Sequence, residues 1–320
     1  MYTVKNVKNI NQWDDFVDSS KNSNIFFKSF FLEPFKKNIL KKFIMKGDEI
    51  KAAFLLVLDK DNNITDNEVI IHSGLIFCSS DSEDNSNFNL ELYSITEFFV
   101  QYIVKNYKKI EFNTVPEFLD VRPFLWYNYG EEKNFFTCYP KYTSFVNIKN
   151  CHKKINQSNK PFNKMNTLRR RLIRKGISAN TKFINSTDIN YFVKSYKDYM
   201  IKQKSLPSVQ KLNEIKKLLK NLLIKEKLTV KIALTKQNEP GYMCIFADDM
   251  KMGYYLYGCP LSEKVENYLG SITFWQAFVE LSKKGIDLID MEGINSPNRG
   301  WFKQSFGGKI KQYFEIKLNN

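Results

Sequence analysis

Residues 300–309 read GWFKQSFGGK, and they decide which fold the sequence predicts. One lysine, Lys303, lies among aromatic side chains shortly before a pair of glycines. A charge in this setting is either solvated at the rim of a core or kept there for a chemical task. Comparison with a similar stretch elsewhere in the chain helps to separate these two interpretations.

A similar stretch, FLWYNYG, occupies residues 124–130. Each stretch follows an amphipathic helix pattern that runs into a short strand pattern, at residues 95–112 in the first half and 272–289 in the second. The strand-like segments FFTCY and IKQYFEIKL then complete the two series. The same elements in the same order predict an internal repeat.

The spacing within the two series supports the repeat. Ile110 precedes Gly130 by 20 residues, and Ile286 precedes Gly307 by 21 residues. Because order and spacing agree, the sequence predicts a duplicated α/β unit.

The repeat separates the lysine from its aromatic neighbours. Counting back three places from Phe306 and from Tyr129 pairs Lys303 with Trp126. The aromatic residues and the first glycine recur, whereas the lysine does not. We therefore expect the fold to require the aromatic residues and the function to require Lys303.

Antiparallel strands are predicted upstream of the helix in the second half. The segment LTVKIALT at residues 228–235 alternates, and residues 241–258 are typical of a hairpin that turns near Asp248 and Asp249. Residues 189–203 and 209–226 have apolar stripes at helical spacing. Each half is thus predicted to be a meander of strands followed by a helix, a strand, a short helix and a closing strand.

The domain boundary is expected near residue 150. Residues 149–164, KNCHKKINQSNKPFNK, are polar and basic without regular periodicity, which is typical of a linker. We predict an α/β (α+β) fold with domains at residues 1–150 and 151–320, each a mixed, mainly antiparallel sheet flanked by helices. The second domain is expected to carry the active site.

The composition favours a globular protein. The chain has 320 residues, of which 43% are hydrophobic and 15% aromatic. It has no apolar run of about 18 residues and no signal-peptide pattern at its start, so we expect a cytoplasmic protein. Five scattered cysteines without CxxC spacing predict no structural metal. Cys151 and His152 are adjacent, but catalytic dyads are normally assembled from separate elements, so no such dyad is expected.

The charge predicts an anionic partner. The formal net charge is +15, and four of the six arginines lie in LRRRLIRKG at residues 168–176. Arginine binds phosphate in a bidentate manner, so Arg169, Arg170 and Arg174 are candidate substrate-phosphate ligands. The alternative is a solvated basic helix face. Gly176 is expected to end this helix.

Taken together, these segments resemble the FemAB-like branch of the GNAT acyltransferase superfamily, which has two GNAT-like domains in tandem. The resemblance rests on NTLRRRLIRKG, YYLYG and ITFWQAFVELSKKGIDLIDMEG, and above all on GWFKQSFGG. Residues 13–37, with a tryptophan helix followed by an aromatic segment, are also similar to the family's opening. These stretches extend over most of the chain.

The resemblance implies transfer of an acyl or aminoacyl group onto a primary amine. The best-known members use aminoacyl-tRNA to build peptide branches of bacterial cell-wall precursors, and shorter relatives are associated with envelope polysaccharide biosynthesis. We therefore expect a bacterial N-acyltransferase in cell-envelope biogenesis. Its acceptor would be a phosphate-bearing sugar or lipid-linked precursor, such as a nucleotide-linked amino sugar.

The donor stays open between acyl-CoA and aminoacyl-tRNA, with no permanently bound cofactor expected. The Q/RxxGxG/A loop of single-domain GNAT enzymes is absent, and the corresponding segment EKVENYLGSITF has one glycine, Gly270, before an expected N-cap at Ser271. A helix N-terminus still offers amides to phosphate, so both residues are candidates for donor binding. The coiled-coil arm of some tRNA-using members is missing.

The catalytic candidates are Lys303, Asp290 and Glu292. The resemblance implies that the lysine of this motif contacts the acyl donor or stabilises developing charge, and an ordinary pKa near 10.4 would keep it cationic. Asp290 and Glu292 share one face of the preceding strand pattern. Either carboxylate could orient or deprotonate an ammonium acceptor, or cap the following loop.

Further substrate-binding candidates lie on both sides of this motif. Tyr254, Tyr255 and Tyr257 offer aromatic surfaces with hydroxyl groups to a sugar or peptide, and Arg299 is a candidate partner for phosphate or carboxylate. Lys36 follows the segment FFLEPF where relatives can contact the acceptor's phosphates, and Lys37 is an equal alternative.

Two other functions remain open. One is an aminoacyl-tRNA-dependent peptidyltransferase that extends a cell-wall peptide, with tRNA as partner. The other is a non-catalytic module that binds nucleic acid or the inner membrane peripherally through its basic helix. Lys303 argues for the enzyme.

Overall fold

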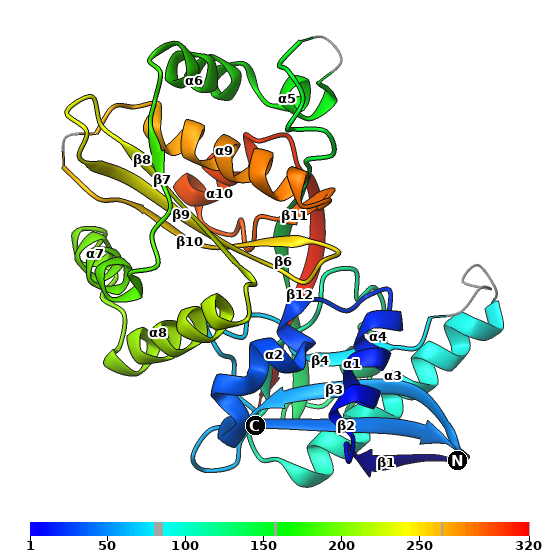
Figure 1. Ribbon diagram of the computed structural model, residues 1–320. Helices are drawn as coiled ribbons and strands as arrows, with labels where there is room; N and C mark the ends of the chain where they lie inside the picture. The colour runs from blue at the N-terminus through cyan, green and yellow to red at the C-terminus, as the bar shows by residue number, and fades with distance from the viewer. Residues whose placement is uncertain (80–85, 157–158, 264, 320) are drawn as a thin grey trace. The chain divides into compact units, whose positions relative to one another are not determined.

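The computed structural model describes residues 1–79, 86–156, 159–263 and 265–319 (Figure 1). Its contacts define two compact units. Unit 1 comprises Met1–Tyr142 and Gln312–Asn320, and unit 2 comprises Thr143–Lys311. The division lies before the boundary expected near residue 150, and the end of the chain belongs to the first unit.

Unit 1 contains a four-stranded antiparallel sheet with the strand order β1-β2-β3-β4. Two helices and two 3₁₀ turns accompany it before the long helix α3. The bounds are β1 (Tyr2–Asn6), α1 (Ile10–Ser19), η1 (Ile25–Phe27), α2 (Ser29–Leu32), η2 (Glu33–Asn38), β2 (Ile39–Lys46), β3 (Glu49–Val57), β4 (Gly74–Phe77) and α3 (Ser86–Asn106).

Helices α1 and α3 cover opposite faces of this sheet. Phe43 on β2 is paired with Ala53 on β3, so Phe54, the next residue on β3, points to the other face. Phe43 packs against Trp13 of α1, with ring centroids 5.9 Å apart. Phe54 packs against Phe99 of α3 at 5.1 Å. Side-chain alternation along the strands therefore gives unit 1 a three-layer core.

The remaining elements of unit 1 are β5 (Glu111–Asn113), α4 (Arg122–Leu125) and most of β6 (Phe135–Asn147). The end of β12 (Lys309–Asn319) pairs antiparallel with β5. Strands β6 and β12 each run from one unit into the other along the chain.

Unit 2 is built on a mixed, mainly antiparallel sheet. Its strand order is β6-β11-β10-β9-β8-β7, and β10 and β11 are parallel. This confirms the predicted sheet type, and the hairpin between β9 and β10 turns at Asp249 as expected. The bounds are α5 (Lys160–Lys164), α6 (Thr167–Ser178), β7 (Phe183–Ile184), α7 (Ile189–Lys202), α8 (Val209–Ile224), β8 (Leu228–Leu234), β9 (Pro240–Asp248), β10 (Gly253–Pro260), α9 (Leu269–Lys283), β11 (Leu288–Asp290) and α10 (Pro297–Gln304).

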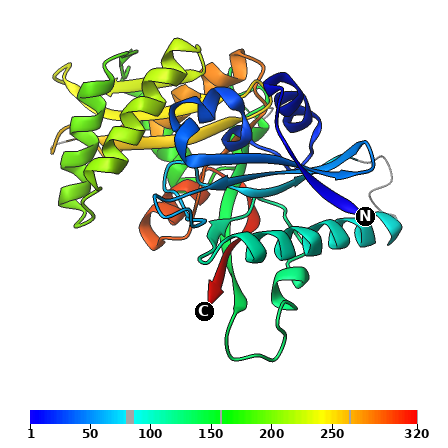
Figure 2. The same ribbon diagram turned by 90° about the horizontal axis from the view of Figure 1, so that it is seen from below.

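Helix α9 lies on one face of the unit 2 sheet, and α7 and α8 lie on the other (Figures 1 and 2). Phe274 and Phe278 of α9 are fully buried and contact Phe246 of β9 and Phe306 after α10. These aromatic contacts link the sheet, α9 and the GWFKQSFGG segment in one core.

Two expected helix ends are wrong. Helix α6 continues past Gly176 to Ser178. A side chain at position 176 would place its Cβ 2.7 Å from Ile272 of α9, which explains why a glycine is needed there. Gly176 therefore allows helix packing and does not end the helix. Helix α9 begins at Leu269 with Tyr268 as N-cap, so Ser271 lies within the first turn.

The predicted repeat is confirmed in the order of elements. Unit 1 has the series α3, β5, α4 and β6, and the second series is α9, β11, α10 and β12. The glycine before the last strand of each series has a left-handed backbone, with φ of 86° at Gly130 and 80° at Gly307. Both glycines therefore have a conformation that favours glycine, although β6 begins five residues after Gly130 and β12 two residues after Gly307.

No helix within the described ranges combines the length and the apolar character needed to span a bilayer.

Candidate active site

Asp290 ends β11 at the point where the parallel pairing with β10 stops. Gly253 and Tyr254 of β10 pair with Ile289 and Asp290. The carboxyl group of Asp290 is buried and accepts hydrogen bonds from the Thr143 hydroxyl and the Glu292 amide, the latter at 2.8 Å. Asp290 is therefore fixed by a neighbouring strand and by its own loop.

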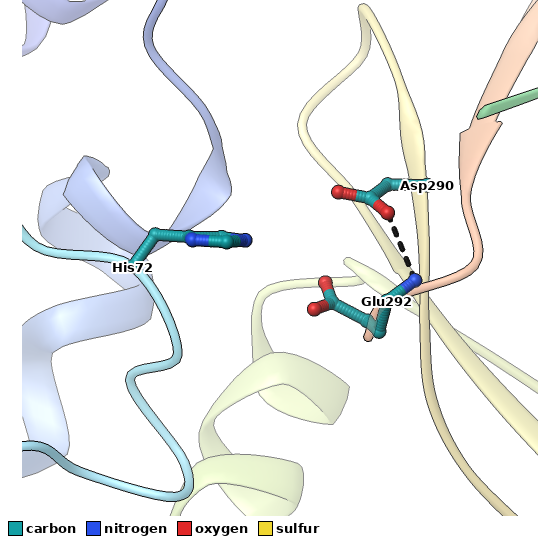
Figure 3. A group of neighbouring side chains, drawn as sticks. All are labelled: His72, Asp290 and Glu292. Carbon is teal, nitrogen blue, oxygen red and sulfur yellow. Dashed lines mark hydrogen bonds between the residues drawn. The ribbon is translucent and has the colours of Figure 1, made fainter. Parts of the chain in front are cut away.

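Glu292 adopts a strained conformation directly after the strand. Its φ is 60°, in the left-handed region that non-glycine residues rarely occupy. Its side chain is 3% exposed, and neither carboxyl oxygen has a hydrogen-bond partner within the described residues. Figure 3 shows the hydrogen bond from its backbone to Asp290. Burying a carboxyl group without a hydrogen-bond partner lowers the stability of the fold, so stability alone does not account for Glu292 at this position.

Lys303 lies on α10 and reaches the same loop. Its Nζ donates a hydrogen bond to the carbonyl oxygen of Gly293 at 3.0 Å. The ammonium also lies 5.1 Å from the ring centroid of Tyr255 on β10, which is a cation–π distance. The strand, the loop and the helix thus bring all three predicted catalytic residues together.

Burial shifts the pKa of each member of this group. It raises the pKa of Asp290 to about 6, although Thr143, the Glu292 amide and Lys303 act in the opposite direction. It also raises the pKa of Glu292 well above its usual value, and the charge of Asp290 adds to the rise. Desolvation lowers the pKa of Lys303 to about 8, against the attraction of both carboxylates.

The expectation of an ordinary pKa for Lys303 is therefore wrong. The lysine is still mainly cationic at neutral pH, but it loses its proton within the physiological range. One cation balances one carboxylate, so the buried group is neutral when the second carboxyl group holds a proton. Because burial and the charge of Asp290 both raise the pKa of Glu292, Glu292 is the carboxyl group of this pair that binds a proton more readily.

The glycines of GWFKQSFGGK serve close packing around Lys303. A Cβ at Gly300 would lie 2.2 Å from the carbonyl oxygen of Ile294, and one at Gly308 would lie 2.1 Å from the Ser144 hydroxyl. At Gly307 a Cβ would lie 2.4 Å from the carbonyl oxygen of Lys164. Gly300 therefore allows α10 to lie against the loop that carries Glu292, and Gly307 and Gly308 allow the chain after α10 to pass close to the end of α5 and to β6.

The positions of unit 1 that correspond to Asp290, Glu292 and Lys303 carry no charged residue. Aligned on Gly130 and Gly307, Asp290 corresponds to Asn113, Glu292 to Val115 and Lys303 to Trp126. Asn113 and Val115 are buried, whereas Trp126 is exposed at the surface beside Tyr93. The fold therefore forms without a lysine and two acids at these positions.

Two of the three tyrosines predicted to bind substrate have structural contacts. The Tyr254 hydroxyl donates to Asp249 at 2.8 Å in the hairpin turn, and the Tyr257 ring packs against Phe192 and Tyr196 of α7. A β-bulge between Tyr255 and Tyr257 changes the alternation of the strand. Tyr255 is the candidate tyrosine that lies beside Lys303.

The arginines of α6 divide into buried and exposed groups. Arg174 is exposed and Arg170 is partly exposed, as phosphate ligands should be. Arg169 is 4% exposed, and its guanidinium donates to the Ser271 and Ser305 hydroxyls. The sequence therefore identified a basic surface, but its first arginine belongs to the interior.

The donor-binding candidates lie in the first turn of α9. Gly270 is partly exposed and Ser271 is buried, with its hydroxyl accepting from Arg169. In the first turn of a helix the amides have no intrahelical partner. The backbone, and not the Ser271 hydroxyl, is thus the group that remains suited to a phosphate.

Two basic candidates lie at the surface. Arg299 is exposed in the first turn of α10, one turn before Lys303, and its charge helps to lower the pKa of Lys303. Lys36 belongs to η2 of unit 1, is well exposed and lies 3.8 Å from Glu33. Within unit 1 this places Lys36 where a solvated anion can reach it.

Sequence reasoning missed Thr143. Thr143 lies 147 positions before Asp290, and only the β6–β11 pairing brings them together. Tyr255 was one of three candidate tyrosines, and the sequence alone did not indicate which of them lies beside Lys303.

Cys151 does not form a catalytic dyad with His152. Its thiol is 1% exposed in the unit 2 core, and burial raises the pKa of the thiol far above its usual value. The Nδ1 atom of His152 lies 2.9 Å from the Ser282 hydroxyl instead. The expectation that these neighbours do not act together agrees with this geometry.

No protein-family model matches the chain, and no curated protein sequence matches it. Solved structures share its fold. FemX has a TM-score of 0.66 and 11% identity, with 98% of this chain and 96% of FemX covered. L-PGS from Bacillus licheniformis has a TM-score of 0.56 and 11% identity, with 98% and 93% covered.

A tandem GNAT protein from the clavulanic acid biosynthesis pathway has a TM-score of 0.54 and 8% identity, with 99% of this chain and 98% of that protein covered. These similarities extend over nearly the whole chain. At such low identities they concern the fold, and they confirm the predicted FemAB-like arrangement of two GNAT-like domains in tandem.

Proposed function

We propose that this protein is an N-acyltransferase that moves an acyl or aminoacyl group from an activated donor to a primary amine. The acceptor would be a phosphate-bearing cell-envelope precursor, such as a nucleotide-linked amino sugar. One observation carries the proposal: Lys303, Asp290 and Glu292 form a buried charged group in unit 2, whereas the matching positions of unit 1 are uncharged. The fold shared with a tandem GNAT protein supports the reaction class.

Glu292 would receive the proton of the acceptor. An amine attacks a carbonyl carbon as the neutral species, so an ammonium must first lose a proton. The Glu292 carboxyl oxygens have no hydrogen-bond partner among the described residues, and the raised pKa makes the carboxylate a better base near neutral pH. Asp290, held by Thr143, keeps the negative charge that balances Lys303.

Lys303 would stabilise the oxyanion as the new C–N bond forms. The carbonyl oxygen of the donor gains negative charge when the amine adds, and a positioned ammonium offsets that charge. The C–S bond of a thioester or the C–O bond of an aminoacyl ester then breaks. The leaving group takes up the second proton, which the nitrogen loses after its attack, and the proton first taken by Glu292 passes to solvent. The products are the amide and a free thiol or hydroxyl.

Basic groups at the surface would bind the phosphates of the substrates. Arg170, Arg174 and Arg299 are accessible in unit 2, and Lys36 is accessible in unit 1. The first-turn amides of Gly270 and Ser271 are suited to a phosphate of the donor. This assignment agrees with the net charge of +15.

An aminoacyl-tRNA donor is the main alternative. The acid-free stretch at residues 149–187 carries eleven lysines and arginines, as binding of a polyanion requires. The fold shared with FemX and with L-PGS is consistent with this donor. Binding of tRNA should weaken steeply with salt, whereas a CoA thioester neutralises few charges and should show a shallow dependence.

The proposal is tested by offering donors and acceptors to the purified protein. Acyl-CoAs and charged tRNA are each incubated with nucleotide-linked amino sugars, and mass spectrometry detects the amide product. Product that requires the protein and Lys303 supports the enzyme. Binding of nucleic acid or anionic vesicles without any acyl transfer would favour the non-catalytic module.

The pH dependence of kcat/KM should be bell-shaped. Glu292 must be unprotonated to act as the base and Asp290 must be a carboxylate, so activity falls as the pH drops. This acid limb lies at about 6, the pKa of Asp290, or above it, because the pKa of Glu292 is also raised. Lys303 acts as a cation, so activity falls as the pH rises through about 8. Asp290→Asn should move the acid limb to lower pH, because the charge of Asp290 contributes to the raised pKa of Glu292. Asp287→Asn is the matched control, because Asp287 is exposed and pairs with Lys149, and its profile should equal that of the wild type.

Glu292→Gln should lower kcat by about 10²-fold, because the amide cannot accept the acceptor's proton. The free energy of unfolding should not decrease, since a neutral amide replaces a buried carboxyl group without a partner. Steady-state kinetics and urea unfolding measure the two effects. A variant that keeps full activity would show that the proton leaves by another route.

A further inference from the structure

Arg169 is the one buried arginine on a helix whose other arginines reach solvent. It is 4% exposed, and burial lowers the pKa of its guanidinium to about 10. Burying a cation costs free energy unless neighbouring groups replace its interactions with water. The groups that the Arg169 guanidinium contacts therefore indicate its role.

The guanidinium holds the inner face of α10 and the residues just after it. Its Nε donates to the Ser305 hydroxyl at 2.9 Å. Its central carbon lies 4.2 Å from the ring centroid of Phe302 and 4.7 Å from that of Phe306, within cation–π range. An Nη1 hydrogen bond to Ser271 ties the same group to α9. One side chain thus connects α6, α9 and the segment around Lys303.

Helix geometry links these contacts to the lysine. Phe302, Ser305 and Phe306 are three and four positions apart, so they share one side of the turn. Lys303 lies about 100° around the helix from Phe302, and its ammonium points to the Gly293 carbonyl. Contacts that prevent α10 from rotating about its axis therefore also fix the direction in which Lys303 points.

The start of α6 makes further contacts with the same segment. The Asn166 amide donates to the Ser305 carbonyl at 3.0 Å, and the Asn166 side chain caps the Arg169 amide at 2.8 Å. Gly307 approaches the Lys164 carbonyl so closely that no Cβ fits. The junction between α5 and α6 is therefore built around the end of α10.

We propose that Arg169 is a positioning residue that sets the orientation of Lys303 through Phe302, Ser305 and Phe306. This rests on the proposed function, in which Lys303 stabilises the oxyanion. It replaces the expectation that Arg169 binds substrate phosphate. A lysine would not do the same, because only a planar guanidinium can lie against two rings while donating hydrogen bonds in two directions.

The deprotonation of Lys303 can be measured without any acyl-transfer assay. Trace labelling with acetic anhydride across a pH series, read by mass spectrometry of the Lys303 peptide, gives the pH midpoint of its deprotonation. The expected wild-type midpoint is about 8. In Arg169→Met and Arg169→Lys, α10 loosens and water reaches the ammonium, so the midpoint should rise by about one pH unit or more.

Activity gives the second measurement. Misplacement of Lys303 should lower kcat by about 10- to 100-fold, with little change in KM for the acceptor. Arg171→Met is the matched control, because Arg171 is exposed on the same helix and should change neither quantity. Ser305→Ala removes the Nε partner with little loss of volume, so it gives a smaller shift in the same direction even if Arg169→Met does not fold.

The outcomes separate position from charge. A raised midpoint in both Arg169 variants, or in Arg169→Lys and Ser305→Ala, supports positioning. A midpoint raised in Arg169→Met but not in Arg169→Lys would mean that only the charge matters and would overturn the proposal, as would unchanged midpoints in folded variants. If Lys303 proves dispensable for transfer, the proposed function fails while the labelling result still decides how Arg169 acts on Lys303.

Discussion

Lys303→Met should lower acyl transfer by roughly 10³-fold while the protein stays folded. The lysine donates a hydrogen bond to the Gly293 carbonyl and lies beside Tyr255, and the attraction of two carboxyl groups opposes the lowering of its pKa. Removing it leaves the developing oxyanion without its cation. Because an interaction made in the transition state is lost, kcat should fall and KM should change little.

The internal repeat provides the matched control for this variant. Trp126 occupies the equivalent place in unit 1 and is exposed, so Trp126→Met should keep the wild-type kcat. Circular dichroism and the apparent melting temperature check that both variants are folded. Activity within about threefold of the wild type in folded Lys303→Met would refute the assigned role of the lysine.

Gly307→Ala should destabilise the protein far more than Gly130→Ala, although both glycines have nearly the same backbone conformation, with φ of 80° and 86°. Each alanine incurs a left-handed strain of about 1–2 kcal/mol. At Gly130 nothing lies within 4 Å of the added Cβ, but at Gly307 the Lys164 carbonyl oxygen lies 2.4 Å away. Overpacking adds about 1–3 kcal/mol, so the total at Gly307 is about 2–5 kcal/mol.

Urea unfolding of the two variants measures this difference. Since the strain cancels between the two positions, the remaining difference in the free energy of unfolding reports the contact between Gly307 and the end of α5. A gap below about 0.5 kcal/mol would show that this contact relaxes freely and that α10 is not held from that side.

The sequence predicted the elements because their signals are local. The alternation at residues 228–235 and the helical stripes at residues 189–203 and 209–226 depend on a few neighbours each, and the structure confirms these elements. The errors come from contacts distant in sequence. Gly176 was expected to end a helix, yet Ile272, almost 100 positions later, explains why a glycine is needed there.

The catalytic candidates were found for a similar reason. Asp290, Glu292 and Lys303 lie within one short segment, so the strand, loop and helix that follow one another bring them together. Thr143 was missed because strand pairing places it beside Asp290. Burial also decides the pKa values, and no local pattern reveals that Lys303 titrates near 8.

The discontinuous course of the chain has a consequence for biosynthesis. Unit 1 begins at the first residue, but β5 takes its antiparallel partner from Glu315–Lys317, near the end of the chain. While the ribosome is still translating unit 2, β5 has an unpaired edge that no earlier segment fills in the native structure. Because unit 2 is continuous in sequence, its strands β7 to β11 can pair with one another before the partner strand of β5 has been synthesised.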